Sequence, residues 1–169
     1  MLSIIKGSSA RVALTRVFLH SCRVRLACLV AVIAFAQPAS THPFAGNWVA
    51  NMAKSQLRPN AQIESERLRF EVTGETVRIS DSVIATSGRE IGQGTTTFVV
   101  DGQAHPHDEL LPGLTAIARW QGPHLLETVL TRRNGQIDRI TYELAENGQT
   151  LTVKTEGDLG GQLIVFDKK

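Results

Sequence analysis

The sequence has few aromatic residues and only two cysteines, and both facts narrow what the protein can be. Phenylalanine, tryptophan and tyrosine together make up 5% of its 169 residues. Both cysteines, Cys22 and Cys28, lie near the N-terminus, so the chain beyond residue 36 has none. That part therefore has no disulfide, no thiolate nucleophile and no thiolate metal ligand. We expect its stability to come from a hydrophobic core.

The first 36 residues also lack acidic side chains. Their basic residues are Lys6, Arg11, Arg16, Arg23 and Arg25, and an unbroken apolar run of 11 residues, LACLVAVIAFA, follows from 26 to 36. A basic front, a short apolar run and alanines at 34 and 36 are typical of a secretory signal peptide. The run is shorter than the roughly 20 residues that span a bilayer as a helix.

We therefore interpret residues 1–36 as a signal peptide cleaved after Ala36. Cleavage a few residues later is the main alternative, and the long basic front also leaves the true translation start open. Export predicts a periplasmic or secreted protein with no stable membrane anchor after cleavage. The remaining residues, 37–169, have a length that suits one domain.

A clustered basic surface is also missing from this second part. Of the 18 basic residues, five lie in the leader, which leaves 13 against 16 acidic residues and a net charge of −3. Nucleic-acid binding usually requires a basic face. We expect no nucleic-acid partner.

Apolar and polar residues alternate along most of residues 37–169. The stretch RLRFEVTGETVRIS, residues 67–80, places Leu68, Phe70 and Val72 on one face and charged residues on the other. Such a period of two indicates half-buried strands. The predicted strands are 45–51, 63–72, 75–84, 90–100, 103–107, 113–121, 124–133, 136–145, 149–156 and 161–168. Residues 52–57 are the only expected helical turn, with Asn51 as a possible cap.

Tight turns separate these predicted strands. Asp101-Gly102, Asn134-Gly135 and Asn147-Gly148 are dipeptides that favour hairpins, because both residues tolerate positive φ. About ten strands joined by hairpins predict an all-β fold, an antiparallel up-and-down barrel in which closure removes the exposed sheet edges. A β-sandwich is the alternative.

The start of the first predicted strand carries a recognisable motif. In PFAGNWVANMAKSQL, residues 43–57, Gly46-Asn47-Trp48 resembles the G-x-W motif of lipocalins and other calycin barrels. Phe44 before it resembles the F-x-G-x-W start of fatty-acid-binding proteins. Residues 95–106, 112–127 and 142–155 extend the similarity to small exported bacterial proteins described as lipocalin-like.

The resemblance implies a structural role for Phe44, Gly46 and Trp48, which would plug one end of the barrel. Lipocalins usually pack an arginine of the last strand on this tryptophan. The last predicted strand here contains no arginine, so Lys168 or Arg119 would take that place. The helical pair of fatty-acid-binding proteins is not expected, because residues 51–62 are too few to form it.

Candidate catalytic and metal-binding residues are sparse. His105 and His107, with His124 from a later turn, are weak candidates for a metal site, and a polar loop explains them equally simply. No G-x-S-x-G or phosphate-loop motif occurs. Glu64, Glu66, Glu127 and Glu143 could pair across strands, as either surface salt bridges or an acid–base pair. We expect no enzymatic activity and no cofactor.

The resemblance implies that the protein holds a small apolar or amphiphilic molecule inside the barrel. The candidate lining residues are Phe70, Phe98, Trp120, Leu130, Tyr142 and Val153, of which Trp120 and Tyr142 would orient the ligand through their polar atoms. A protein-binding or inhibitor module of the cell envelope, with a filled barrel and an unknown protein partner, is the alternative. An enzyme or a haem- or metal-binding barrel is the third reading.

Overall fold

A computed structural model describes residues 42–158 and 160–169. The predicted signal peptide lies outside these residues. Within them, no helix is long and apolar enough to cross a membrane.

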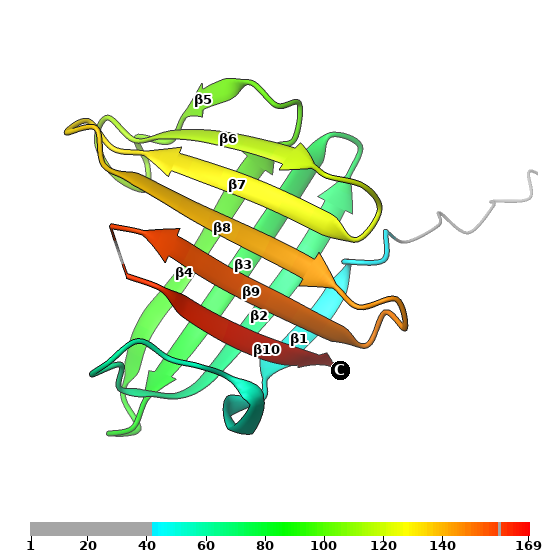
Figure 1. The fold of residues 1–169 in the computed structure, drawn as a ribbon, viewed down its shortest axis with the longest axis vertical. Helices are drawn as coiled ribbons and strands as arrows, with labels where there is room; N and C mark the ends of the chain where they lie inside the picture. Colours follow the sequence, from blue (N-terminus) through cyan, green and yellow to red (C-terminus); the bar gives the residue numbers. More distant parts are fainter. Residues whose placement is uncertain (1–41, 159) are drawn as a thin grey trace, which may run out of the picture. The chain divides into compact units, whose positions relative to one another are not determined.

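Ten antiparallel strands account for most of the described residues (Figure 1). They are β1 (Gly46–Ala50), β2 (Ile63–Thr73), β3 (Thr76–Ala85), β4 (Glu90–Val99), β5 (Ala104–Pro106), β6 (Thr115–Trp120), β7 (Leu125–Thr131), β8 (Ile137–Leu144), β9 (Thr150–Gly157) and β10 (Gln162–Lys168). Every predicted strand is present, with ends within two residues of the expected ones. The alternation of apolar and polar residues was therefore sufficient to place them.

The hairpin between β2 and β3 illustrates why the chain folds this way. Leu68 and Phe70 are buried while Arg67 and Arg69, between and beside them, are exposed. Gly74 has a φ of 57°, which lets the chain reverse between Thr73 and Thr76. One face of the hairpin therefore turns inward along its whole length.

The strands follow one another in a single sheet, in the order β4-β3-β2-β1-β10-β9-β8-β7-β6-β5. Pairing of β1 with both β2 and β10 curls the sheet on itself, and Figure 1 shows β5–β10 crossing in front of β1–β4. No ladder joins β4 to β5 within the described residues. The fold is thus a nearly closed up-and-down barrel, as predicted, and it retains a gap between its first and last strands in the sheet order.

We name the two ends of the barrel by the loops that form them. The closed end contains residues 42–45 and the connections 74–75, 100–103, 121–124 and 145–149. The cavity end contains the connections 51–62, 86–89, 107–114, 132–136 and 158–161.

The closed end is packed around Trp48, which is fully buried. Its indole Nε1 donates a hydrogen bond to the carbonyl oxygen of Phe44 at 3.0 Å, so the one polar atom of the ring is satisfied. Lys168 lies over the indole, with Nζ 4.9 Å from the ring centroid, and donates to the carbonyl oxygen of Pro43 at 2.9 Å. Lys168, rather than Arg119, is therefore the cation at the tryptophan.

The structure explains why the first position of the G-x-W motif is a glycine. Gly46 has a φ of 131°, and a Cβ built on it would come within 3.2 Å of the Lys168 Cε atom. A side chain at this position would strain the backbone and displace the lysine from the indole. Glycine therefore permits the Trp48–Lys168 contact.

The connection between β1 and β2 contains one short 3-10 helix, η1 (Met52–Lys54). The expected helical turn is thus limited to three residues. Asn51 precedes it without capping it, because the Asn51 Nδ2 atom donates instead to Asp167 Oδ2 at 2.8 Å. The Asn51 side chain therefore ties this connection to β10 rather than to the helix.

Candidate ligand site

A cavity of about 230 Å³ lies inside the barrel, toward the cavity end. Its wall is mainly apolar and includes side chains from seven strands and from the connection between β5 and β6. The apolar lining residues are Leu68, Ile79, Phe98, Leu110, Leu130, Ile140, Tyr142, Val153 and Ile164, and the polar ones are Glu66, Asp81, Thr96, Thr155 and Gln162. Such a wall, apolar with a few polar groups, is typical of a small-molecule site.

The acidic residues face the cavity because they continue the inward face of their strands. Glu66 precedes the buried Leu68 by two residues on β2, and Asp81 follows the buried Ile79 by two residues on β3. Leu68 pairs with Asp81 and Glu66 pairs with Val83, which makes the two acids diagonal neighbours on adjacent strands. Diagonal neighbours in a sheet are separated by about 7–8 Å at their backbones.

Asp81 has room for its carboxylate because β4 has no side chain opposite it. Asp81 pairs with Gly94, and a Cβ built on Gly94 would lie 3.1 Å from Asp81 Oδ1. A Cβ built on Gly92, the next residue on that face, would lie 3.9 Å from Asp81 Oδ2, an ordinary contact distance. The two glycines therefore let an acidic side chain lie against the wall of the barrel.

Burial makes ionisation of Glu66 and Tyr142 difficult. Burial, followed by the charge of Asp81, raises the pKa of Glu66 to about 7. Burial, with smaller contributions from Glu66 and Asp81, raises the pKa of Tyr142 above its ordinary value. Gln162 contributes a further polar atom, because its side-chain Oε1 is buried without a hydrogen-bond partner. The cavity wall thus contains acceptors whose needs the protein does not fully meet.

Aromatic rings separate the cavity from the closed end. Phe70 lies edge-on to Tyr142, with ring centroids 5.5 Å apart, and 5.9 Å from Phe44. Phe44 in turn lies 5.1 Å from Trp120, which is 4.5 Å from the ring of His42. Burial lowers the pKa of His42, which favours its neutral form. This continuous aromatic packing forms a floor below the cavity.

Exposed apolar side chains gather at the other end. Four of the five exposed large hydrophobic residues in the described part of the chain lie in or beside connections of the cavity end: Ile91, Leu110, Leu111 and Ile137. Leu110 also lines the cavity. It therefore marks the route by which an apolar molecule would reach the interior.

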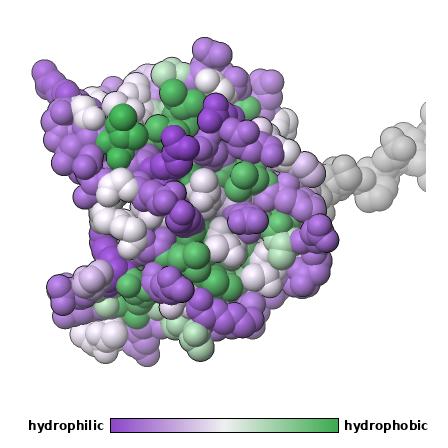
Figure 2. Space-filling view, in the orientation of Figure 1, coloured by the Kyte–Doolittle hydropathy of each residue, from purple (hydrophilic) through white to green (hydrophobic). Residues whose placement is uncertain are grey.

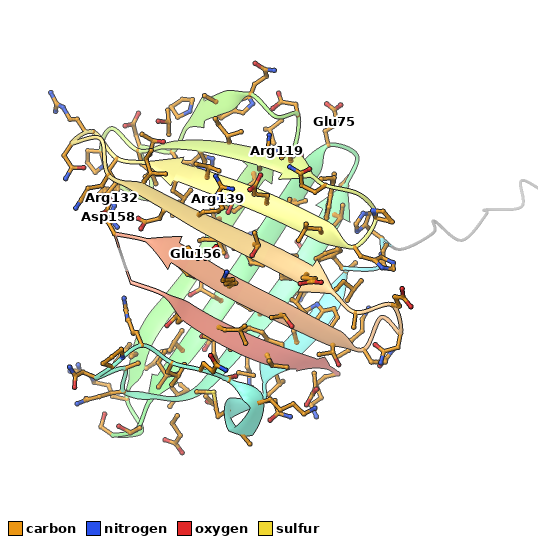
Figure 3. The ribbon with its side chains drawn as sticks, in the orientation of Figure 1. Glu75, Arg119, Arg132, Arg139, Glu156 and Asp158 are labelled. Atoms are coloured by element: carbon orange, nitrogen blue, oxygen red, sulfur yellow. The ribbon has the colours of Figure 1, made fainter. Side chains whose placement is uncertain are left out.

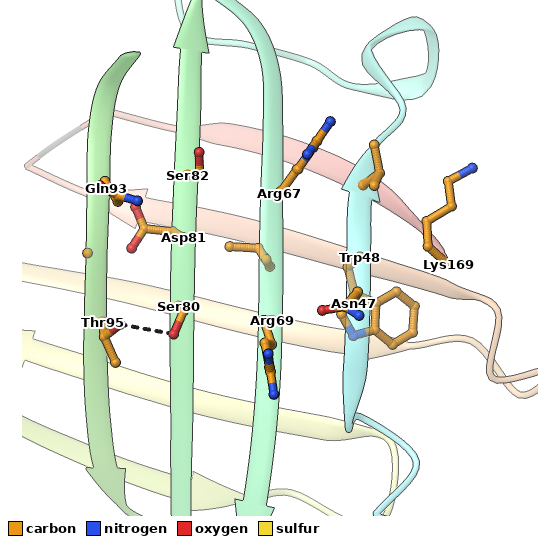
Figure 4. A pocket seen from close by; sticks show the side chains of 13 residues that line it. Asn47, Trp48, Arg67, Arg69, Ser80, Asp81, Ser82, Gln93, Thr95 and Lys169 are labelled. Carbon is orange, nitrogen blue, oxygen red and sulfur yellow. Dashed lines mark hydrogen bonds between the residues drawn. The ribbon is translucent and has the colours of Figure 1, made fainter.

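A second hollow, of about 470 Å³, lies on the outer surface of β1–β4 (Figure 4). Arg67 and Arg69 of β2 border it, and Ser80 and Thr95 hydrogen-bond across its floor at 2.9 Å. Most of its lining side chains alternate outward from the barrel, while Leu68 and Asp81 border both this groove and the interior cavity. The groove is larger than the interior cavity, but it lies on the outside of the sheet and not within the barrel.

The outer surface of β6–β8 has an ion-pair network. Glu127 Oε2 accepts from Arg119 Nη2 at 2.6 Å, and Glu127 Oε1 accepts from Arg139 Nη1 at 2.8 Å (Figure 3). The hydrogen bond from Arg119 is the main cause that lowers the pKa of Glu127. Figure 2 shows hydrophobic side chains divided by hydrophilic ones over this side of the barrel. Glu127 and its arginines therefore belong to a surface network and not to the cavity.

Four of the six residues expected to line a ligand cavity do line it: Phe98, Leu130, Tyr142 and Val153. Phe70 and Trp120 are not among its lining residues, because they lie nearer the closed end and pack into the aromatic floor. Phe44 and Trp48 are fully buried at the closed end.

Sequence reasoning missed the polar side of the cavity. Glu66 was considered only as one of several acids, and Asp81, Thr96, Thr155 and Gln162 were not considered. The signal was present in the alternation, since position 66 is in phase with 68 and 70, and position 81 with 77 and 79. Polar residues at inward positions are informative, because burying them without a partner is costly.

The histidines do not come together. His105 Nε2 lies 3.0 Å from Asp101 Oδ1, and the buried His107 lies with Nδ1 2.9 Å from Glu109 Oε1. His107 also packs on Phe98, with ring centroids 5.3 Å apart. His124 lies at the opposite end of the barrel from His107, in the connection between β6 and β7. Among the described residues, no three His, Cys, Asp or Glu side chains form a group able to hold a metal ion.

Comparisons with known proteins identify the fold and not the family. No family model matches the chain, and no curated protein sequence matches it. The solved structures that match include wild-type fluorescent protein UnaG, with a TM-score of 0.55, 12% identity and coverage of 75% of this chain and 97% of that chain.

Two fatty-acid-binding proteins also match. That of Schistosoma mansoni, in complex with arachidonic acid, gives a TM-score of 0.55 at 10% identity over 78% of this chain and 99% of that chain. Fatty-acid-binding protein 1 of Echinococcus granulosus gives 0.52 at 10% identity over 75% and 97%. The chain is thus similar to these proteins across nearly their whole length, and it shares their barrel fold.

Proposed function

We propose that the protein binds a small apolar or amphiphilic molecule in the cavity inside its barrel. The single observation that carries this proposal is the cavity itself, enclosed by the strands and lined mainly by apolar side chains. A barrel built only for stability would fill this space, because each void in a core costs stability. An apolar wall with a few polar groups can bind such a molecule and orient it.

The proteins of similar fold support the same proposal. Two of them are fatty-acid-binding proteins, one in complex with arachidonic acid. Because the sequence identity is only 10–12%, the similarity concerns the barrel fold. The kind of ligand must be inferred from the residues of this chain. A binding role also agrees with the isolated positions of the histidines.

Export is part of the proposal. The basic front, the apolar run 26–36 and the alanines at 34 and 36 are the features of a signal peptide. The protein would then bind its ligand in a bacterial periplasm or outside the cell. Residues 37–169 contain no cysteine, so an oxidising compartment would not affect them through thiol oxidation. Detection of a mature N-terminus at residue 37 by mass spectrometry would test this part independently.

A protein-binding role is the second candidate, and one observation favours it. Leu110 and Leu111 are adjacent and exposed on the connection between β5 and β6. Exposed apolar residues of this kind occur where partners bind. A bulky substitution inside the cavity distinguishes the two roles. It would block binding of a small ligand, but it would leave the exposed leucines and any protein partner's binding unchanged.

Native mass spectrometry of the protein, produced from the full chain and purified without detergent, tests the proposed function. We expect a fraction of the molecules to retain a small molecule that is released on unfolding. Leu130→Phe adds a ring to the cavity wall and should abolish the retained mass. Val129→Phe adds the same bulk to the outward face of β7, so it should leave the mass unchanged.

A wild-type protein that is free of ligand in repeated preparations, and that takes up no apolar molecule when one is supplied, would contradict the proposed function. Retention of the same molecule by Leu130→Phe would place the binding outside the cavity. Either result would direct attention to the exposed leucines and to a protein partner.

A further inference from the structure

Most polar groups of the cavity wall can accept hydrogen bonds, although the Tyr142 hydroxyl and the Gln162 amide can also donate. Glu66 and Asp81 bring carboxylates, and Gln162 brings the buried Oε1 that has no partner in the protein. Thr96 and Thr155 have hydroxyls, which accept as well as donate. A ligand that satisfies this wall must therefore supply donors.

The charges of the wall point the same way. Among the described residues, no lysine, arginine or histidine lines the cavity. Arg119 and Arg139 bind Glu127 on the outer surface, and Arg132, in a connection of the cavity end, reaches the buried Asp138, with Nη2 3.2 Å from Oδ2. An anionic head group would face two carboxylates with no cation beside it. A buried charge without a partner is strongly unfavourable.

We propose that the ligand is a protonated amine on an apolar body, with its ammonium group directed at Glu66 and Asp81. This deepens the proposed function and rests on it, because it names the ligand class of the same cavity. An ammonium group has three donors and no acceptor, so it matches the wall in both charge and hydrogen bonding. The apolar body lies against Phe98, Leu130 and Val153.

The difficulty of ionising Glu66 supports this assignment. Burial, and after it the repulsion from Asp81 in the same cavity, raises the pKa of Glu66 to about 7. A bound ammonium ion places a positive charge beside both carboxylates, which favours their ionised forms and lowers the pKa of Glu66 again. The protein thus keeps, in the absence of ligand, an unfavourable arrangement that a cation relieves.

The size of the cavity limits the apolar body. At about 230 Å³ it exceeds the roughly 150 Å³ that suffices for a benzene molecule in an apolar core. It is below the 300–1,000 Å³ of typical drug-sized pockets. One aromatic ring with a chain of about three carbons is therefore a suitable probe, whereas a long acyl chain would have to extend through the cavity end.

Three probes with the same body separate the head groups: 3-phenylpropylamine, 3-phenylpropan-1-ol and 3-phenylpropanoate. Their affinities are measured by isothermal titration calorimetry at pH 8, where Glu66 is mostly ionised. We expect the amine to bind at least tenfold more tightly than the carboxylate, with the alcohol between them. Exclusion of all three by Leu130→Phe, but not by Val129→Phe, shows that they bind in the cavity.

Charge-removing variants then test the named carboxylates. Glu66→Gln and Asp81→Asn should each weaken the amine about tenfold or more, while the alcohol changes by less than about threefold. Glu143→Gln is the matched control, because Glu143 is exposed on the outer face of β8. Circular dichroism of each variant confirms that the barrel is intact.

The outcomes separate the two proposals. If the carboxylate binds as tightly as the amine, or if Glu66→Gln leaves amine affinity unchanged, the ligand class is wrong while the binding function stands. If the alcohol exceeds the amine, a neutral donor replaces the cation and the proposal is overturned. If no probe enters the cavity and no ligand is retained in native mass spectrometry, the proposed function fails as well.

Discussion

The inward-facing side chains of the strands differ between the two ends of this barrel: they pack tightly at the closed end and surround a cavity toward the cavity end. At the closed end, Phe44, Trp48 and Phe70 are packed ring against ring, and the indole N–H is satisfied by a backbone carbonyl. Toward the cavity end, the inward positions hold Glu66, Asp81 and Gln162 around a space that the protein does not fill. The closed end thus supplies stability, and the cavity end gives up the stability that a filled core would provide.

The largest effect is expected where the closed end is densest. Trp48→Ala should lower the free energy of unfolding by ~3–5 kcal/mol, because it leaves a cavity under Lys168 and removes the hydrogen bond to Phe44. Urea unfolding followed by circular dichroism measures it. A loss below about 1 kcal/mol would mean that Trp48 is not the centre of the packing.

At the cavity end, substitution of a buried acid should raise the free energy of unfolding instead of lowering it. Glu66 has a pKa of about 7 in the folded protein, against an ordinary value of 4.5 in the unfolded chain. Between these values the unfolded chain releases a proton that the folded chain keeps, so stability falls as pH rises through this window and the full loss is present above pH 7. Glu66→Gln should therefore raise the free energy of unfolding by about 3 kcal/mol at pH 8, and by almost nothing at pH 4.

Urea unfolding of wild-type protein and Glu66→Gln across pH 4–8 gives this difference directly. Glu143→Gln, on the outer face, should show no comparable pH dependence. A difference between wild type and Glu66→Gln that is constant over the pH range would show that Glu66 is not perturbed by burial.

A smaller loss is expected at the edge of the closed end. Gly46→Ala should lower the free energy of unfolding by about 1–2 kcal/mol, because of the positive φ and the close approach of Lys168. Gly161→Ala is the control: its backbone needs no positive φ, and its nearest neighbour atom is 3.9 Å from a built Cβ. Equal effects of the two variants in thermal unfolding would contradict a specific role for Gly46.

The smallest effect belongs to the outer surface, which both ends share. Arg139→Ala should lower stability by no more than about 0.5–1 kcal/mol, because the arginine is half-exposed and Glu127 keeps Arg119 as a partner. It should leave ligand affinity unchanged. A larger loss in urea unfolding would place Glu127 within the stabilising core rather than at the surface.

The closed end could be predicted from the sequence better than the cavity end. The alternation of Leu68, Phe70, Val77 and Ile79 determined the strands and the hairpin, since a period of two leaves one face buried. The motif around Trp48 placed the packed end at the first strand. These signals are local, and each is readable within a few residues.

The cavity could be anticipated only in part, because it depends on long-range register. Whether an inward position packs against another or faces empty space is decided by strands far apart in the sequence, such as β2, β8 and β10. That is why Phe70 lies in the floor while Phe98, equally apolar and equally inward, lines the cavity. Asp81 is placed by the glycines opposite it on β4, a relation that no short motif contains.

The central claim is that the space between Phe98, Leu130, Tyr142 and Val153 is a binding site. Methyl NMR spectra of the protein, titrated with 3-phenylpropylamine, test it most directly. We predict saturable shifts of the methyl groups of Leu130, Ile140 and Val153, while those of the outward-facing Val49 and Val129 stay in place. Shifts confined to Val49 and its neighbours in the outer groove, or no saturable shifts at all, would contradict the claim.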